Sequence, residues 1–156
     1  MMNPPDCTVY HRAIRPSARE RKCSGGIIEV MQELKQTVAT GEYDAGVVAR
    51  DIVDVCVDRK ASDVTLIDVG KVTTLADFFV IATGNSERQI NALRSAVDDR
   101  GGELGIRLFQ TEGLPADGWV LLDYGQVIVH LFAAEQRTYY DLERRWKEAP
   151  TLVKIQ

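Results

Sequence analysis

Asp123 and His130 are the two residues of this chain whose types and spacing come nearest to a catalytic pair. They lie in the segment 119–132 (WVLLDYGQVIVHLF), whose composition predicts two strands, and alternation along a strand would place both on one face. A histidine there could act as a general base, with Asp123 or Ser86 as its partner. The chain has no nucleophile elbow or oxyanion-hole pattern. Because a strand histidine between apolar neighbours is more often packed and hydrogen-bonded, we expect His130 to be structural rather than catalytic.

The turn Thr83-Gly84-Asn85-Ser86 is a second candidate site, because it opens a predicted helix whose free N–H groups could cradle a phosphate. Similar Gly-Ser turns occur in nucleotidyltransferases, which hold Mg²⁺ with two carboxylates two positions apart on one strand. Here Asp63 and Asp68 are five positions apart and would point to opposite faces. With that metal site missing, the residues favour a capped strand-to-helix turn, and a nucleotide-binding protein of this type is kept as the alternative function.

The composition of the chain excludes several classes of protein function. The two histidines, His11 and His130, lie far apart, and the three cysteines form no CxxC pair, so we predict no metal and no cofactor. Scattered cysteines fit a reducing cytosol, and no apolar run is long enough for a membrane span. The net charge of −4 argues against a protein that holds DNA or RNA through its own overall charge, although it leaves room for a local basic patch.

The N-terminal residues differ from the rest of the chain. Residues 1–26 hold five Lys or Arg against two acidic residues, and three of the five prolines. We predict that residues 1–30 are a basic, disordered extension, with a targeting peptide or a true start at Met31 as alternatives. One domain over residues 31–150 and a short tail, 151–156, are expected to follow.

Hydrophobic periodicity places the remaining elements. Asp44 is a plausible N-cap, and Ser86 with Gln89 forms an S-x-x-Q capping box. The order of elements predicts an α/β (α+β) fold with a mixed five-stranded sheet and helices packed on it. The expected helices are 31–39, 43–59, 86–100 and 135–146, and the expected strands are 63–69, 78–83, 106–110 and the two halves of 119–132.

The segment 119–132 itself predicts a β-hairpin around Tyr124-Gly125 with two apolar faces. One face is aliphatic and suits a core under helices. The other mixes aromatic, carboxylate and imidazole groups, and what covers it is left open. Trp119 and Tyr140 are candidates for a protein interface, whereas Tyr139 and Trp146 are expected in the core. The aliphatic face consists of Val120, Leu122, Val127, Val129 and Leu131, and the mixed face of Trp119, Leu121, Asp123, Ile128, His130 and Phe132.

Four short blocks, in order and at matching spacing, give the chain a family resemblance. Residues from about 44 to 150 resemble the ribosomal silencing factors, also called the Iojap-like family. The blocks are Leu75–Gly84 (LADFFVIATG), Ser86–Ile90 (SERQI), Trp119–Gly125 (WVLLDYG) through Val129-His130, and Glu135-Gln136-Arg137 through Tyr140–Trp146 (YDLERRW). The chain departs from the family in the extension 1–30 and at Gln126, where many members have an acidic residue.

The resemblance implies a cytoplasmic, non-enzymatic repressor of translation. It implies a nucleotidyltransferase-like topology without the metal carboxylates, and no direct contact with DNA or a membrane. Family members bind the fourteenth-numbered protein of the large ribosomal subunit and sterically block joining with the small subunit, and a role in large-subunit maturation is also attributed to them. A homodimer is a further expectation for the free protein. The residues carried over as the partner-binding surface are Trp119, Leu121, Asp123, Tyr124, His130, Arg137, Tyr140 and Glu143.

Overall fold

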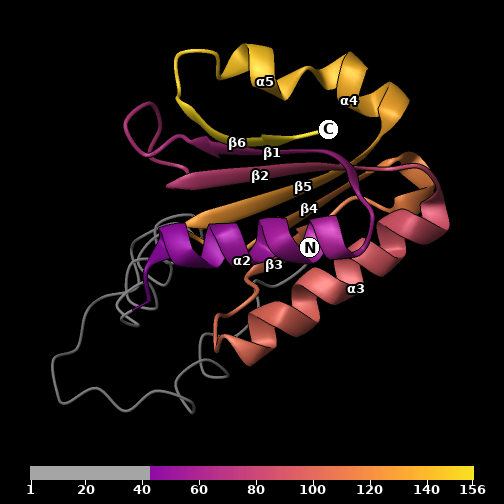
Figure 1. The fold of residues 1–156 in the computed structure, drawn as a ribbon, viewed down its shortest axis with the longest axis horizontal. Helices are drawn as coiled ribbons and strands as arrows, with labels where there is room; N and C mark the ends of the chain where they lie inside the picture. The colour runs from indigo at the N-terminus through magenta and orange to yellow at the C-terminus, as the bar shows by residue number, and fades with distance from the viewer. Residues whose placement is uncertain (1–42) are drawn as a thin grey trace, which may run out of the picture. The chain divides into compact units, whose positions relative to one another are not determined.

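The computed structural model describes residues 43–156, which form a sheet with helices on both of its faces (Figure 1). The extension 1–30 and the helix expected over 31–39 lie outside the described residues. The elements, in chain order, are α2 (Ala45–Asp58), β1 (Ser62–Asp68), β2 (Phe78–Gly84), α3 (Glu87–Glu103), β3 (Gln110–Glu112), the 3₁₀ helix η2 (Pro115–Asp117), β4 (Trp119–Asp123), β5 (Val127–Ala133), α4 (Ala134–Tyr140), α5 (Leu142–Arg145) and β6 (Thr151–Ile155).

The sheet is mixed, as predicted, but it has six strands rather than five, in the order β3-β4-β5-β2-β1-β6. Strands β2 and β5 are parallel, and the other neighbouring pairs are antiparallel. The added strand, β6, lies in the segment predicted as a tail. Its side chains are mostly exposed, with only Val153 partly buried, so the segment has no strong apolar alternation. Backbone pairing with β1 makes it a strand, and sequence periodicity cannot report that pairing.

The predicted third strand is also displaced. Of the segment 106–110, only the polar residue Gln110 joins the sheet, as the first residue of β3; the apolar residues before it do not. Ile106 is buried in the core, and the N–H of Phe109 donates to the carbonyl of Asp123 at 2.8 Å, directly before the ladder between β3 and β4 begins. The apolar pattern therefore reflects burial of a loop beside the sheet rather than a strand.

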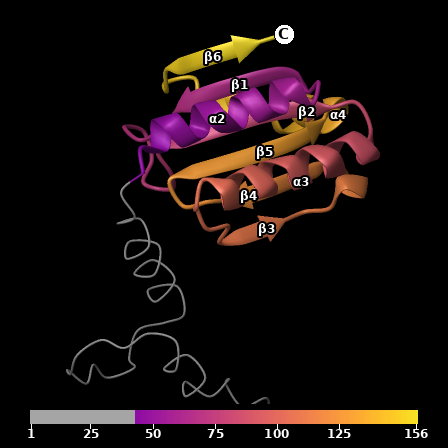
Figure 2. The ribbon, with the colours of Figure 1, turned by 60° about the horizontal axis from the view of Figure 1, so that its bottom comes forward.

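Helices α2 and α3 pack side by side on one face of the sheet (Figures 1 and 2). The side chain of Asp44 accepts from the N–H of Gly46 at 2.8 Å, which confirms it as the α2 N-cap. Ser86 is confirmed as the α3 N-cap, since its Oγ accepts from the N–H of Gln89 at 3.2 Å. The Gln89 side chain reaches back to the N–H of Asn85 at 2.8 Å rather than to that of Ser86, so the predicted capping box forms one residue out of register.

α3 continues beyond the expected end at Arg100 and includes Gly101. Gly101 does not end the helix; it leaves room for the Tyr124 ring, which would lie only 2.9 Å from a Cβ at this position.

The expected last helix, 135–146, is in fact two short helices. Asp141 has a left-handed backbone (φ 42°) and separates α4 from α5. This break changes which side chains face the sheet. Tyr139 was predicted to be in the core and instead is 82% exposed, so that prediction is wrong. Trp146 packs against the second core cluster, as predicted. α4 and α5 lie on the face of the sheet opposite α2 and α3 (Figure 1).

Candidate functional site

The hairpin forms, with Trp119 opposite Phe132, Leu121 opposite His130 and Asp123 opposite Ile128. The N–H of Tyr124 donates to the carbonyl of Val127 at 3.0 Å, so the two central turn residues are Gly125 and Gln126, one position later than predicted. Gly125 has a φ of 84°, a backbone that glycine adopts without strain. The Asp123 carboxylate accepts from the N–H of Gly125 at 2.7 Å. The carboxylate thus braces the turn.

The two faces of the hairpin divide as predicted. The aliphatic face lies in the larger core cluster, under α2 and α3. Trp119, Ile128 and Phe132 of the mixed face lie in a second cluster, which α4, α5 and the residues after them cover in part. The chain's own C-terminal helices therefore cover part of the mixed face, whose cover was left open by the sequence pattern. We call the rings of this second face the aromatic cluster: Phe79, Trp119, His130, Phe132, Tyr140 and Trp146.

Trp119 is central to the exposed side of the aromatic cluster. Its ring centroid lies 4.5 Å from that of Tyr140 and 5.3 Å from that of Phe132, against which it stacks with an interplanar angle of 20°. Offset and tilted ring pairs at these separations are favourable beyond the area that they bury. Trp119 and Tyr140 are both only partly buried, so the cluster presents a fixed aromatic edge to solvent.

His130 lies beneath this edge and is buried, at 6% exposed. Its Nδ1 accepts a hydrogen bond from the indole N–H of Trp119 at 3.3 Å, and Phe79 meets its ring edge-on. Burial lowers the pKa of His130 from 6.5 to about 4, so the ring is neutral near pH 7 and can accept this bond. His130 therefore orients Trp119 in the protein, which agrees with the structural role expected for it.

Arg137 fastens α4 to the sheet. Its guanidinium donates to Thr83 Oγ1 at 2.8 Å and Thr65 Oγ1 at 3.0 Å, and also contacts the carbonyl of Asp63 and the carboxylate of Glu143. Only 12% of the Arg137 side chain is exposed. The family resemblance placed Arg137 and Glu143 on the partner-binding surface; in the structure they bind each other, and Arg137 also binds the strands. Sequence reasoning missed this clasp, whose only signal was a threonine facing the same side on each of two strands.

Tyr124 does not lie with the other predicted site residues. Its ring is 1% exposed and packs beneath α3 in the aliphatic core, and burial raises the pKa of its hydroxyl. Alternation after Asp123 explains the placement, because Tyr124 continues the face of Val120 and Leu122. The structure thus brings Trp119 and Tyr140 together at one edge, with the partly buried Leu121 on the same strand face as Trp119. It adds the exposed ring of Tyr139, whose centroid is 5.1 Å from that of Tyr140.

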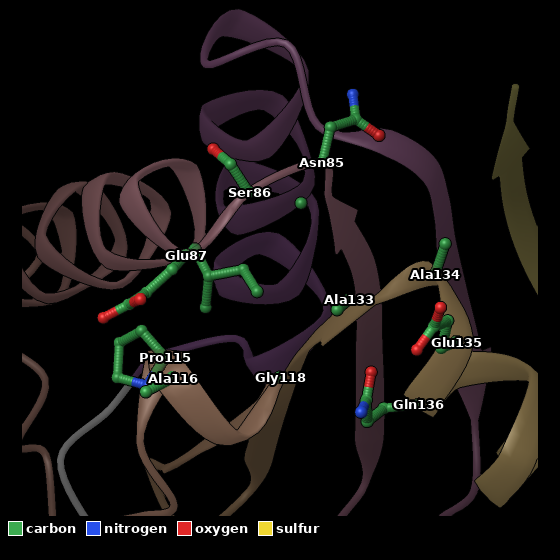
Figure 3. Close-up of a pocket in the computed structure, with 12 residues that line it drawn as sticks. Asn85, Ser86, Glu87, Pro115, Ala116, Gly118, Ala133, Ala134, Glu135 and Gln136 are labelled. Carbon is green, nitrogen blue, oxygen red and sulfur yellow. The ribbon is translucent and has the colours of Figure 1, made fainter.

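A pocket of about 360 Å³ opens where the parallel strands β2 and β5 end (Figure 3). The turn 84–87, helix η2 and the start of α4 line it, and this is where the phosphate-cradling turn was considered. Glu87 and Glu135 contribute carboxylates, and no Lys or Arg is among the lining residues. Across residues 43–156 no three His, Cys, Asp or Glu side chains are grouped to hold a metal ion. A nucleotide's phosphates would meet negative charge without a counter-ion.

Comparison with known proteins points to one family. Residues 42–156 match the model of a family described as ribosomal silencing factor during starvation. The chain is 39% identical over 95 residues to the ribosomal silencing factor RsfS of Bacillus subtilis, covering 61% of this chain and 80% of that protein. It is 32% identical over 121 residues to the chloroplastic protein Iojap of Arabidopsis thaliana, covering 76% of this chain and 50% of that protein.

Solved structures share the fold. A crystal structure of a protein from Chromobacterium violaceum superposes with a TM-score of 0.65 at 32% identity, covering 67% of this chain and 88% of that one. A second, from Bacillus halodurans, has a TM-score of 0.56 at 35% identity and covers 78% of this chain and 98% of that one. The mixed sheet of the described residues is therefore an architecture already seen in proteins of related sequence.

Proposed function

Because this chain belongs to the ribosomal silencing factor family, we propose that it represses translation by binding the large ribosomal subunit and sterically blocking its joining with the small subunit. The partner that we propose within the large subunit is its fourteenth-numbered protein. A second role in large-subunit maturation would use the same contact. The site of action that we propose is the cytoplasm, and no helix among residues 43–156 is long and apolar enough to cross a membrane.

The observation that carries the proposal is the partly exposed edge of the aromatic cluster. Aromatic side chains held rigidly at a surface are typical anchors of protein interfaces, because they bury a large area with little loss of side-chain entropy. Trp119 is held by the hydrogen bond to His130 and by stacking on Phe132. Tyr139, at 82% exposed, enlarges the same edge. A partner that covers these rings would complete a face that the chain covers only in part.

The predicted site residues divide into two groups within this proposal. Trp119, Leu121 and Tyr140 reach the surface and are the proposed contacts, with Tyr139 added. His130, Asp123 and the Arg137–Glu143 pair act through them: they hold the indole, the hairpin turn and helix α4 in place. Tyr124 supports the hairpin from the other side. Acidity of the chain as a whole would speed encounter with a basic ribosomal protein.

The mechanism is occupation of a surface, so it needs no reaction. The proposal requires only that the bound domain overlaps the region that the small subunit must touch. The relatives are named for silencing, a regulatory role, which agrees with a function of this kind. Affinity for the large subunit then has to compete with subunit joining under the conditions in which translation is to be lowered.

Two measurements test the function. The purified protein should sediment with free large subunits and be absent from assembled ribosomes. When subunits are mixed, light scattering should show less joining as the protein concentration rises, with half-inhibition near the Kd for the large subunit. Undiminished joining at saturating protein would rule out the steric mechanism, even if binding were found.

The alternative function, nucleotide binding in the pocket at the end of β2, is weakened by its lining. Glu87 and Glu135 are there and a cation is not. Calorimetry with ATP and Mg²⁺ at millimolar concentration distinguishes the two: no heat of binding is expected. Saturable heat that Ser86→Ala and Glu87→Gln alter would revive the alternative.

We also propose that, without ribosomes, a second copy of the chain covers the aromatic edge. Light scattering should then give the mass of a dimer that dissociates when large subunits are added. A monomer at high concentration would contradict this dimer and leave the ribosomal contact in place.

A further inference from the structure

Charge is divided unevenly along the described chain. Residues 43–143 hold nine Lys or Arg against seventeen Asp or Glu, a net charge of −8. Residues 144–156 hold four cations, Arg144, Arg145, Lys147 and Lys154, against Glu148 alone, a net charge of +3. A domain that is acidic almost throughout thus ends in a basic segment.

The four cations are free to meet a partner. All four side chains are exposed. Within the part of the chain that the structure describes, none of them forms an ion pair, whereas Arg100 and Arg137 do. The cations therefore do not serve the fold through charge pairing. Unneutralised like charges held in one segment repel one another, so an anionic partner would be favoured there.

The basic segment adjoins the aromatic cluster. Arg144, Arg145 and Lys147 flank Trp146, whose ring centroid lies 5.4 Å from that of Phe79 inside the cluster. Lys154 on β6 is paired with Thr65 on β1, and paired residues share a face of the sheet. Thr65 Oγ1 accepts from Arg137 of α4, so Lys154 lies on the same face of the sheet as α4. We call Arg144, Arg145, Lys147 and Lys154 the basic surface.

We propose that the basic surface binds phosphates of ribosomal RNA while the aromatic edge binds protein. This inference rests on the proposed function, because a large ribosomal subunit presents RNA and protein side by side. Exposed Lys and Arg side chains are typical contacts of the nucleic-acid backbone, and such contacts hold the protein on the RNA without reading its sequence. The same RNA would repel the acidic remainder of the domain. Attraction of the basic surface and repulsion of the acidic part together orient the domain with its basic surface toward the RNA.

The test compares two variants with equal change of charge. In the first, Arg144, Arg145, Lys147 and Lys154 are each replaced by Gln. In the matched control, Arg50, Arg59, Lys60 and Arg88 are replaced by Gln; these are exposed cations of the α2 and α3 side. Affinity for large subunits is measured by sedimentation across a salt series, with circular dichroism to check folding.

Each phosphate contact contributes about 0.7 to 0.9 to the slope of log affinity against log salt, so loss of four contacts should flatten the slope by about 3. At low salt the affinity of the first variant should fall by about 100-fold, and that of the control by less than about threefold. Equal slopes for wild type and the first variant would overturn the proposal.

Two further probes separate this inference from the proposed function. On the isolated fourteenth-numbered protein, the first variant should bind like wild type; an equal loss there would mean that the basic surface contacts that protein, and would overturn the RNA contact. On deproteinised large-subunit RNA, wild type should bind with salt dependence and the first variant should not. Binding to that RNA without binding to intact subunits would support the RNA contact and sink the proposed function.

Discussion

The two faces of the sheet are built differently. The face under α2 and α3 is aliphatic and closed, with Ile52, Leu122 and Leu131 fully buried, and both covering helices begin with side-chain caps. The face under α4 and α5 is aromatic and partly open, and neither covering helix has a side-chain cap. A clasp through Arg137 holds the α4–α5 cover instead.

We propose that the difference separates stability from recognition. Aliphatic packing under long helices supplies non-directional burial, which holds the fold together. The aromatic face uses hydrogen bonds and ring stacking, which fix the direction of a few side chains. Each of the following predictions changes one face, and its result should follow from the face that it touches.

The largest expected effect is on the aliphatic face. Leu122→Ala removes a fully buried side chain, so the free energy of unfolding should fall by about 3 kcal/mol. Urea denaturation measures it, and Leu152→Ala, at a position 44% exposed on β6, is the control and should change little. Binding of the folded Leu122→Ala protein to large subunits should be unaffected. A loss below about 1 kcal/mol would show that this face is not the stabilising one.

The aromatic face should make stability depend on pH. The pKa of His130 is about 4 in the folded protein and near 6.5 when unfolded, so the unfolded state takes up a proton first as pH falls. The contribution of neutral His130 to the free energy of unfolding is therefore fully present above pH 6.5, and it is lost progressively as the pH falls to about 4. The free energy of unfolding should fall by about 3 kcal/mol over this pH range.

Comparison with His130→Gln isolates this effect from the titration of carboxylates. The free energy of unfolding of the variant should be lower near pH 7 and should fall less steeply between pH 6.5 and 4. Parallel pH profiles for the two proteins would contradict a buried neutral imidazole.

Removing the Arg137 contacts should lower the free energy of unfolding by a smaller amount and should loosen mainly α4 and α5. Arg137→Met leaves the Glu143 carboxylate and the hydroxyls of Thr65 and Thr83 without the guanidinium, and should lower the free energy of unfolding by about 2 kcal/mol. Hydrogen exchange should rise in α4 and α5 more than in α2 and α3. Arg144→Met, at an exposed position, is the control, and a uniform rise over the whole domain would argue against a local clasp.

The smallest effect expected is at the α3 cap. Ser86→Ala removes the acceptor for the N–H of Gln89 and should lower the free energy of unfolding by about 1 kcal/mol. Ser95→Ala, at an exposed position within α3, should be neutral or slightly stabilising. A thermal melt of both variants tests the difference, and equal melting temperatures would show that the Ser86 cap does not stabilise this face.

Local signals predicted much of this fold. Alternation along 119–132 sorted the hairpin into its two faces, and residue type at the helix starts identified Asp44 and Ser86 as caps. These features depend on residues within a few positions of one another. The strand β6, by contrast, depends on pairing with β1 some ninety residues earlier, and its own side chains carry little periodicity.

The site was predicted less completely, for a related reason. Trp119 and Tyr140 were each predicted as candidate interface residues, and both are partly exposed. The exposure of Tyr139 follows from the left-handed Asp141, which no helical period reveals. The family resemblance placed Arg137 and Glu143 on the partner-binding surface. Their roles depend on threonines of β1 and β2, more than fifty residues away, so only the folded chain shows the clasp.

The central claim is that the aromatic edge, and not the helical face, meets the ribosome. The Kd for purified large subunits, measured by sedimentation for Trp119→Ala/Tyr140→Ala, tests it most directly. Val47→Ala, at a position 51% exposed on α2, is the matched control, and Tyr139→Ser provides a second variant that removes no buried group. The account predicts that the double variant, still folded, binds about 100-fold more weakly and Tyr139→Ser measurably so, while Val47→Ala binds like wild type. Unchanged Kd values for both aromatic variants would contradict it.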